Sequence, residues 1–215
     1  MRSIKSSNKH ALILNSRKTE STPALFLDRD GVVIEDVHYI KRPDEVKICP
    51  GIDDLMKQAS QLKVPVVIVT NQSGISRGYT TWEAYEKVSK HMLQLLDYPK
   101  ALVAIYANSE IEYTGKINEW RKPGAGMIFK AAKEFNLSIE NSAMIGDRLS
   151  DLEAGVNAGM KKIYHVLTGH GRNERAKIPS KIASKLTTHS AKIRLIDSLE
   201  GYDLSKEPNI SLVKK

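Results

Sequence analysis

Cysteine is almost absent from this chain of 215 residues, and long apolar runs are missing. The single cysteine, Cys49, excludes an internal disulfide and any zinc site built from several cysteines. No apolar stretch approaches the roughly 20 residues that a membrane-spanning helix needs. The short apolar run at residues 11–14 follows a polar, basic start, so no secretory signal peptide is expected. The default expectation is a cytoplasmic protein with no membrane partner.

Positive charge is unevenly distributed. The net charge of +8 would suit a nucleic-acid-binding protein, but residues 1–23 carry +4 and residues 172–215 carry +5, which leaves −1 for the middle. We therefore expect a basic N-terminal extension (1–23), one domain at 24–171, and a basic C-terminal segment (172–215) that completes or flanks it. The ends should be flexible or peripheral. They could touch RNA or an acidic partner, but the charge distribution argues against nucleic acid.

Apolar strands and amphipathic helices alternate from Ala24 onward. Strands are expected at 24–27, 64–69, 102–106, 143–145 and 162–166, and helices at 52–62, 85–96, 127–135 and 151–158. Thr80 and Glu83 are expected to form a capping box before the second helix, and Pro123 to open the third. This alternation predicts an α/β fold, a doubly wound (Rossmann-like) parallel sheet with helices on both faces.

Polar side chains follow the expected strands at their carboxyl ends, where open parallel sheets bind ligands. Asp28, Thr70 and Asp147 each end a strand, and Lys122 lies in the loop after the third. Asp30 follows Asp28 by two positions, so in an extended strand both carboxylates would share a face and repel each other. A divalent cation such as Mg²⁺ would relieve that repulsion. Taken singly, each motif also has a plain structural interpretation. Asp28 and Asp30 could lie in a solvated turn, Lys122 could belong to a solvated basic pair, and Asp147 could mark the start of a helix.

Taken together, the groups indicate phosphoryl transfer through an aspartyl-phosphate. Between about residues 24 and 169 the chain resembles the haloacid dehalogenase-like superfamily. The resemblance implies that Asp28 is the nucleophile, Asp30 the general acid and base, and Thr70 and Lys122 the groups that hold the phosphoryl oxygens. It also implies Mg²⁺ bound by the Asp28 carboxylate, the Asp30 backbone carbonyl and Asp147. Asp151 would lie just behind these ligands.

The segments at residues 28–31, 35–39, 43–45, 70–78 and 121–123 resemble those of the D-glycero-D-manno-heptose 1,7-bisphosphate phosphatases and their histidinol-phosphatase relatives. The intervals between motifs leave no room for a large cap domain, so the site should be open. The resemblance implies nine substrate contacts: Asp36, Val37, His38, Tyr39, Asn71, Gln72, Ser73, Arg121 and Arg148. Arginine also suits an anionic ligand, because its guanidinium fork matches phosphate.

One loop departs from this family. Relatives carry a Cys/His zinc loop before the Arg-Lys-Pro motif, whereas residues 107–120 contain neither residue type, so no structural zinc is expected. Trp120 could pack this loop or stack on substrate, and we favour packing.

The leading hypothesis is a monomeric, Mg²⁺-dependent phosphatase of a small phosphorylated sugar, the heptose bisphosphate first. Histidinol phosphate or another small phosphomonoester is the alternative. Two further alternatives are a nucleic-acid 3′-phosphatase and a non-catalytic phospho-aspartate switch.

Overall fold

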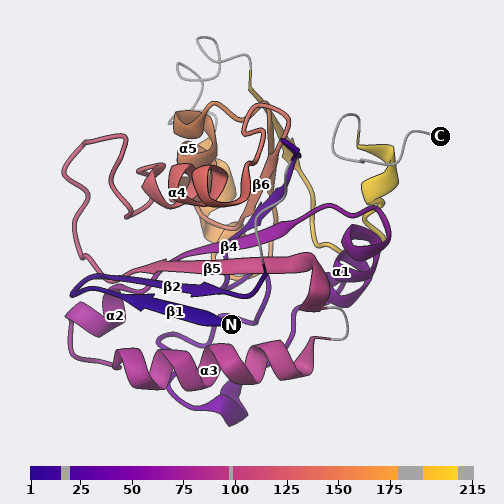
Figure 1. Cartoon of the computed structure of the whole chain (residues 1–215). Helices are drawn as coiled ribbons and strands as arrows, with labels where there is room; N and C mark the ends of the chain where they lie inside the picture. Colours follow the sequence, from indigo (N-terminus) through magenta and orange to yellow (C-terminus); the bar gives the residue numbers. More distant parts are fainter. Residues whose placement is uncertain (16–19, 97–98, 179–190, 208–215) are drawn as a thin grey trace.

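One mostly parallel sheet crosses the molecule (Figure 1). The computed structural model describes residues 1–15, 20–96, 99–178 and 191–207. Within them the strand order is β1-β2-β5-β4-β3-β6-β7-β8. The strands are β1 (Arg2–Lys5), β2 (Lys9–Ile13), β3 (Leu25–Leu27), β4 (Val66–Asn71), β5 (Leu102–Asn108), β6 (Ala143–Gly146), β7 (Lys162–His165) and β8 (Lys192–Leu195). From β5 to β8 all neighbours are parallel, whereas β1 and β2 are antiparallel.

The central strands are buried on both faces, as their uninterrupted apolar sequences require. In β3, Phe26 lies between Val67 of β4 and Met144 of β6. Because neighbouring side chains alternate between the two faces of a sheet, Leu25 and Leu27 enter one core and Phe26 the other. Two apolar cores therefore flank the strand that ends at Asp28.

Helices cover both faces. The buried sides of α1 (Ile52–Gln61) and α3 (Trp82–Leu95) share a core with Leu25 and Leu27. The buried side of α4 (Gly126–Phe135) packs in the core that holds Phe26, and α5 (Leu149–Ala158) contributes to that core and to a third cluster with β7. Figure 1 shows α3 below the sheet and α4 and α5 above it. The prediction of a doubly wound α/β fold is confirmed, and no large cap covers the described part.

Short helical turns complete the order. They are η1 (Pro43–Glu45), α2 (Ser73–Ser76), η2 (Pro99–Ala101), α6 (Gly171–Glu174), η3 (Arg175–Lys177) and η4 (Leu204–Lys206). Two of the longer helices end on residues in the left-handed conformation, α4 at Asn136 (φ 56°) and α5 at Gly159 (φ 89°). Both helices end where the sequence analysis expected, at residues 135 and 158.

The helix starts correct two expectations. The cap of α3 is Thr81, whose side chain accepts a hydrogen bond from the Ala84 backbone N–H at 3.2 Å, so the capping box expected from Thr80 is wrong by one position. Pro123 does not open α4, because the chain still turns at residues 121–124 and the helix begins at Gly126.

Both ends of the chain add strands that the sequence analysis did not predict. Residues 2–13 form an antiparallel hairpin whose second strand, β2, pairs with β5 and extends the sheet. β8, in the C-terminal segment, pairs with β7 at the opposite edge. Residues 179–190 and 208–215 of that segment lie outside the described residues. Among the described helices, none combines the length and the apolar character that crossing a membrane requires.

Candidate active site

A cavity of about 520 Å³ opens where β3, β4 and β6 end. Its walls come from the loops after these strands, the segment at residues 36–40, and the loop between β5 and α4. It brings together most of the residues expected at the site: Asp28, Asp30, Asp36, His38, Tyr39, Asn71, Gln72, Ser73, Arg121, Lys122 and Arg148. Thr70 and Asp147 are buried just behind the lining, at 1% and 0% exposure. Val37 does not line the cavity and is 44% exposed.

Asp28 lies at the base of the cavity and is joined to a buried lysine. The Nζ atom of Lys122 is 2.8 Å from Asp28 Oδ1 and 2.7 Å from Asp151 Oδ1, and it donates to the Val69 carbonyl at 2.8 Å. Burial alone would favour neutral Lys122, but Asp151 and Asp28 outweigh it and raise the pKa of Lys122. Lys122 is therefore a fixed cation beside Asp28.

Three buried carboxylates meet at this point. Oxygen atoms of Asp28, Asp147 and Asp151 all lie within 4.8 Å of one another. Burial, first, and the neighbouring carboxylates raise the pKa of Asp147 to about 8; burial likewise raises that of Asp28 to about 7, against the pull of Lys122. Asp147 Oδ2 accepts from the His170 backbone N–H at 2.7 Å, whereas its buried Oδ1 has no hydrogen-bond partner.

This donor set fits a hard divalent cation. Mg²⁺ prefers carboxylate and carbonyl oxygens, and a cation would offset the burial and the repulsion that raise both carboxyl pKa values. Gly31 keeps the space open, since a Cβ atom there would lie 2.6 Å from Asp147 Oδ2. Asp151 belongs to the cluster as closely as the other two, although its Oδ1 is also paired with Lys122.

Asp28 and Asp30 line the same cavity but have different partners. The strand ends at Leu27, so strict alternation does not reach position 30. The Asp30 carboxylate instead accepts from the Arg29 guanidinium, at 2.8 and 3.0 Å from Nη2, and from Gln72 Nε2 at 2.7 Å. Each aspartate thus has its own cationic partner.

The turn after β4 connects these groups. Asn71 exchanges two hydrogen bonds with the Lys122 backbone, at 2.9 and 3.0 Å, and so holds the loop that carries the lysine. Gln72 Nε2 also donates to Thr70 Oγ1 at 2.8 Å. Thr70 Oγ1 lies 3.5 Å from Asp30 Oδ2. The hydroxyl expected to hold a phosphoryl oxygen is therefore fixed beside the expected acid and base.

The flap at residues 36–39 is held from two sides. Asp36 Oδ2 is 2.8 Å from His170 Nε2 and 3.8 Å from Arg148 Nη2. His38 and Tyr39 have left-handed backbones, with φ of 51° and 61°, a conformation that is costly for such residues and is found at functional sites. These turns place the Tyr39 ring directly over Gly74, where a Cβ atom would lie only 2.5 Å from it.

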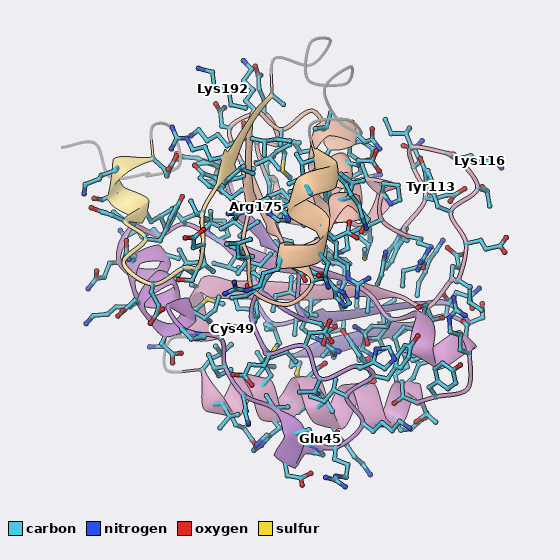
Figure 2. All side chains as sticks on the ribbon, turned by 180° about the vertical axis from the view of Figure 1, so that it is seen from behind. Glu45, Cys49, Tyr113, Lys116, Arg175 and Lys192 are labelled. Atoms are coloured by element: carbon cyan, nitrogen blue, oxygen red, sulfur yellow. The ribbon has the colours of Figure 1, made fainter. Side chains whose placement is uncertain are left out.

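The loop before Lys122 forms the outer wall. Arg121 Nη1 donates to the Glu110 carbonyl at 2.7 Å, and Ile111 and Tyr113 line the cavity. Figure 2 shows Tyr113 and Lys116 on this loop, which projects from the body of the molecule. Trp120 packs edge-on against Tyr106, with ring centroids 5.7 Å apart, so the packing interpretation is confirmed.

Several residues of the site were missed. Arg29 stood between two aspartates, but alternation placed it on the opposite face. His170 and Tyr113 lie in segments with no recognisable motif and reach the cavity only through the fold. A cation directly before Asp30 was the one signal in the sequence that could have been used.

A family model and several named proteins match this chain. The HAD-hydrolase-like family matches residues 119–189. A D-glycero-alpha-D-manno-heptose-1,7-bisphosphate 7-phosphatase from Campylobacter jejuni is 40% identical over 139 residues, which cover 64% of this chain and 78% of that protein.

This chain belongs to the HAD-like phosphatases. A D-glycero-beta-D-manno-heptose-1,7-bisphosphate 7-phosphatase from Escherichia coli K12 is 33% identical over 70% of this chain and 82% of its own length. One from Mesorhizobium japonicum is 37% identical over 64% of this chain and 66% of its own length. The structure of the D,D-heptose 1,7-bisphosphate phosphatase from B. bronchiseptica, complexed with magnesium and phosphate, aligns with a TM-score of 0.65 and 27% identity, covering 83% of this chain and 94% of the other. The chain is a phosphatase, and its relatives are named for a heptose bisphosphate.

Proposed function

We propose that this HAD-like phosphatase is a Mg²⁺-dependent phosphomonoester hydrolase that works through a phosphorylated Asp28, and that its substrate is D-glycero-D-manno-heptose 1,7-bisphosphate, cleaved at the 7-phosphate. The observation that carries the mechanism is the placement of Asp28. It lies at the base of an open cavity, 2.8 Å from a buried lysine, in a cluster of three carboxylates. The substrate assignment is supported by the names of the relatives.

The proposed reaction has two steps. In the first, an Asp28 oxygen attacks phosphorus, the bond from phosphorus to the sugar oxygen breaks, and Asp30 gives that oxygen a proton. In the second, water attacks the phosphorus of the aspartyl-phosphate, Asp30 takes a proton from the water, and the Asp28 carboxylate is released. Asp30 then holds the proton that it gives to the leaving oxygen in the next catalytic cycle. Acid–base help of this kind contributes roughly 10²–10⁴-fold to the rate.

The remaining polar groups would hold the phosphoryl oxygens. Thr70 lies beside Asp30 on β4, and the buried Lys122 lies beside Asp28 in the loop before α4. Both are therefore pre-organised for the charge that develops during transfer. Asp28, Asp147 and the Asp30 backbone carbonyl would bind the metal, with Asp151 close behind through its pairing with Lys122. When bound, Mg²⁺ would neutralise charge so that an anionic substrate can approach Asp28.

A second anionic group on the substrate is supported by the arginines at the cavity. Burial lowers the pKa of Arg121, and the nearby guanidinium groups of Arg77 and Arg148 lower it further. Holding these positively charged groups close together costs free energy, and a dianionic ligand would offset that cost. A bisphosphate matches this arrangement better than a monophosphate, because one phosphate can bind at Asp28 while the other meets the arginines.

A substrate panel tests this assignment. We would compare kcat/KM for both anomers of heptose 1,7-bisphosphate, heptose 7-phosphate, histidinol phosphate, other sugar phosphates and a 3′-phosphorylated oligonucleotide. We expect the heptose bisphosphate to be hydrolysed best, and Arg121→Met to reduce its advantage over the 7-monophosphate. Equal rates on the two heptose phosphates would contradict a second phosphate subsite. Preference for the oligonucleotide would replace the proposed substrate.

A further inference from the structure

Arg29 is a fully buried charge that the proposed reaction does not use directly. Its side chain is 1% exposed, although it lies between two residues of the catalytic turn. Burying a guanidinium is costly unless a carboxylate and hydrogen bonds compensate it. Among the described residues the ion-pair partner of Arg29 is Asp30, with Nε at 3.2 Å from both carboxylate oxygens and Nη2 at 2.8 and 3.0 Å.

The contacts around Asp30 fix the orientation of its carboxyl group. Arg29 and Gln72 both donate to it, and Gln72 in turn accepts from Arg29 Nη2 at 3.1 Å. These three contacts hold the plane of the Asp30 carboxyl group from two sides. They therefore fix the direction in which Asp30 faces the cavity.

Helix α3 gives Arg29 a rigid support. The guanidinium lies over the ring of Tyr85, 5.0 Å from its centroid, a cation–π geometry in a buried place. Behind Tyr85, the His10 ring of the N-terminal hairpin packs edge-on at 5.4 Å, and His10 Nε2 lies 2.7 Å from Glu86. Arg29 is thus held between the carboxylate and a packed helix, with little freedom to leave.

We propose that Arg29 is a positioning residue, which holds the Asp30 carboxylate where it accepts the proton of the water that breaks down the aspartyl-phosphate. In that step the water oxygen bonds to phosphorus, the bond between phosphorus and Asp28 breaks, and the water proton moves to Asp30. The inference rests on the proposed function, since it needs Asp30 as the base. It adds that the direction of Asp30 depends on Arg29.

The test separates the two chemical steps with p-nitrophenyl phosphate, whose leaving group needs no proton. Rapid mixing measures a burst of nitrophenol from the first step and a steady rate from the second. For Asp30→Asn and Arg29→Met we expect a burst of about one equivalent followed by a steady rate slowed by roughly 10²-fold, the size of a lost general base. The double variant should be no slower than Asp30→Asn alone, because both changes remove one function.

A control with the same two kinds of contact, on a more exposed arginine, is available at the far edge of the sheet. Arg194 also lies over a tyrosine ring, that of Tyr164 at 5.9 Å, and pairs with the buried Glu207 at 2.8 Å. Arg194→Met removes the same kind of contact away from the cavity, so it should lower stability without a burst. Arg29→Lys keeps the buried charge but loses the fork. It should fold even if Arg29→Met does not, and it should still slow the second step.

The outcomes distinguish the two claims. If Asp30→Asn produces a burst but Arg29→Met and Arg29→Lys keep the wild-type steady rate, Arg29 does not position Asp30 and the inference is wrong. If Arg29→Met slows burst and steady rate equally, as a general packing defect would, the inference is also wrong. If Asp30→Asn itself leaves both phases unchanged, the proposed role of Asp30 fails instead.

Discussion

Lys122 and Asp28 illustrate how single residues define this site. Both side chains are almost fully buried, and their 2.8 Å contact lies next to Asp151 and Asp147. Burial and the surrounding carboxylates raise the pKa of Asp28 despite Lys122, so in the absence of a cation its negative charge is poorly accommodated. A carboxylate that is buried at such a cost in free energy fits a chemical role better than a structural one.

Replacing Asp28 should therefore affect chemistry and not folding. We expect Asp28→Asn to reduce turnover by roughly 10³-fold or more, because it removes the nucleophile while keeping the size of the side chain. An acid whose pKa is raised in the folded protein lowers the free energy of unfolding as the pH rises above the ordinary pKa of that acid. In metal-free buffer at pH 8 the variant should thus unfold at no lower temperature than the wild type. Steady-state assays and thermal unfolding followed by circular dichroism would measure both.

At this scale the sequence analysis located most positions but not their partners. Asp28, Thr70, Lys122 and Asp147 were found because each follows an apolar strand, and parallel strands end at one edge. The pairing of Asp30 with Arg29 was not found, since it depends on the chain leaving the strand at Leu27. Two-residue alternation holds only inside a strand.

Among the elements, the flap depends on close contact with α2. Gly74 leaves room for the Tyr39 ring, and a Cβ atom there would meet the ring at 2.5 Å. We expect Gly74→Ala to displace Tyr39 and to raise KM for the substrate several-fold with a smaller effect on kcat, because Tyr39 lines the cavity and has no part in the proposed chemical steps. Steady-state kinetics would show the split, and a change confined to kcat would contradict the assignment of Tyr39 to substrate binding.

The N-terminal hairpin is joined to α3 by a partly exposed ionic contact. Glu86 Oε1 lies 2.6 Å from Lys5 Nζ and 2.7 Å from His10 Nε2. Partial burial opposes ionisation of Glu86, but Lys5 and His10 outweigh it and lower its pKa to about 2. Because this folded pKa lies below the usual value, the stabilisation is present above about pH 4.5 and is lost as the pH falls toward 2.

The variant Glu86→Gln tests that contact. It should lower the free energy of unfolding by about 1–3 kcal/mol at pH 7, and the difference from the wild type should shrink between pH 4.5 and pH 3. Urea denaturation across this range would measure it. A difference that stays constant with pH would show that Glu86 contributes through packing and not through its charge.

The elements that the sequence analysis missed share a cause. β1 is exposed throughout, and the buried run of β2 is only four residues long, so the sequence analysis recognised neither as a strand. Their pairing with each other and with β5 is a long-range contact that no local pattern reveals. The cap was likewise placed one position early, at Thr80 and not at Thr81, because the turn before the helix decides where the helix begins.

For the molecule as a whole, metal binding should be linked to proton release. Burial and mutual repulsion raise the pKa of Asp28 to about 7 and that of Asp147 to about 8, so protons compete with a cation for these carboxylates below those values. We expect Mg²⁺ to raise the melting temperature more at pH 8.5 than at pH 6. The expected gain is about 2.7 kcal/mol at 100 times the dissociation constant.

Scanning fluorimetry with and without Mg²⁺ at the two pH values would measure this linkage, and chelation should abolish turnover reversibly. Asp147→Asn should remove most of the Mg²⁺ effect. An equal shift at both pH values would mean that the cation binds elsewhere. The monomeric state stays a prediction, which light scattering can test.

Trapping the phosphorylated enzyme tests the central claim most directly. Acid quench of Asp30→Asn during turnover, followed by peptide mass spectrometry, should find one phosphoryl group per chain on the peptide that contains Asp28. Asp28→Asn should show none. A phosphoryl group on another residue, or full turnover with no trapped phosphate in either protein, would contradict the account.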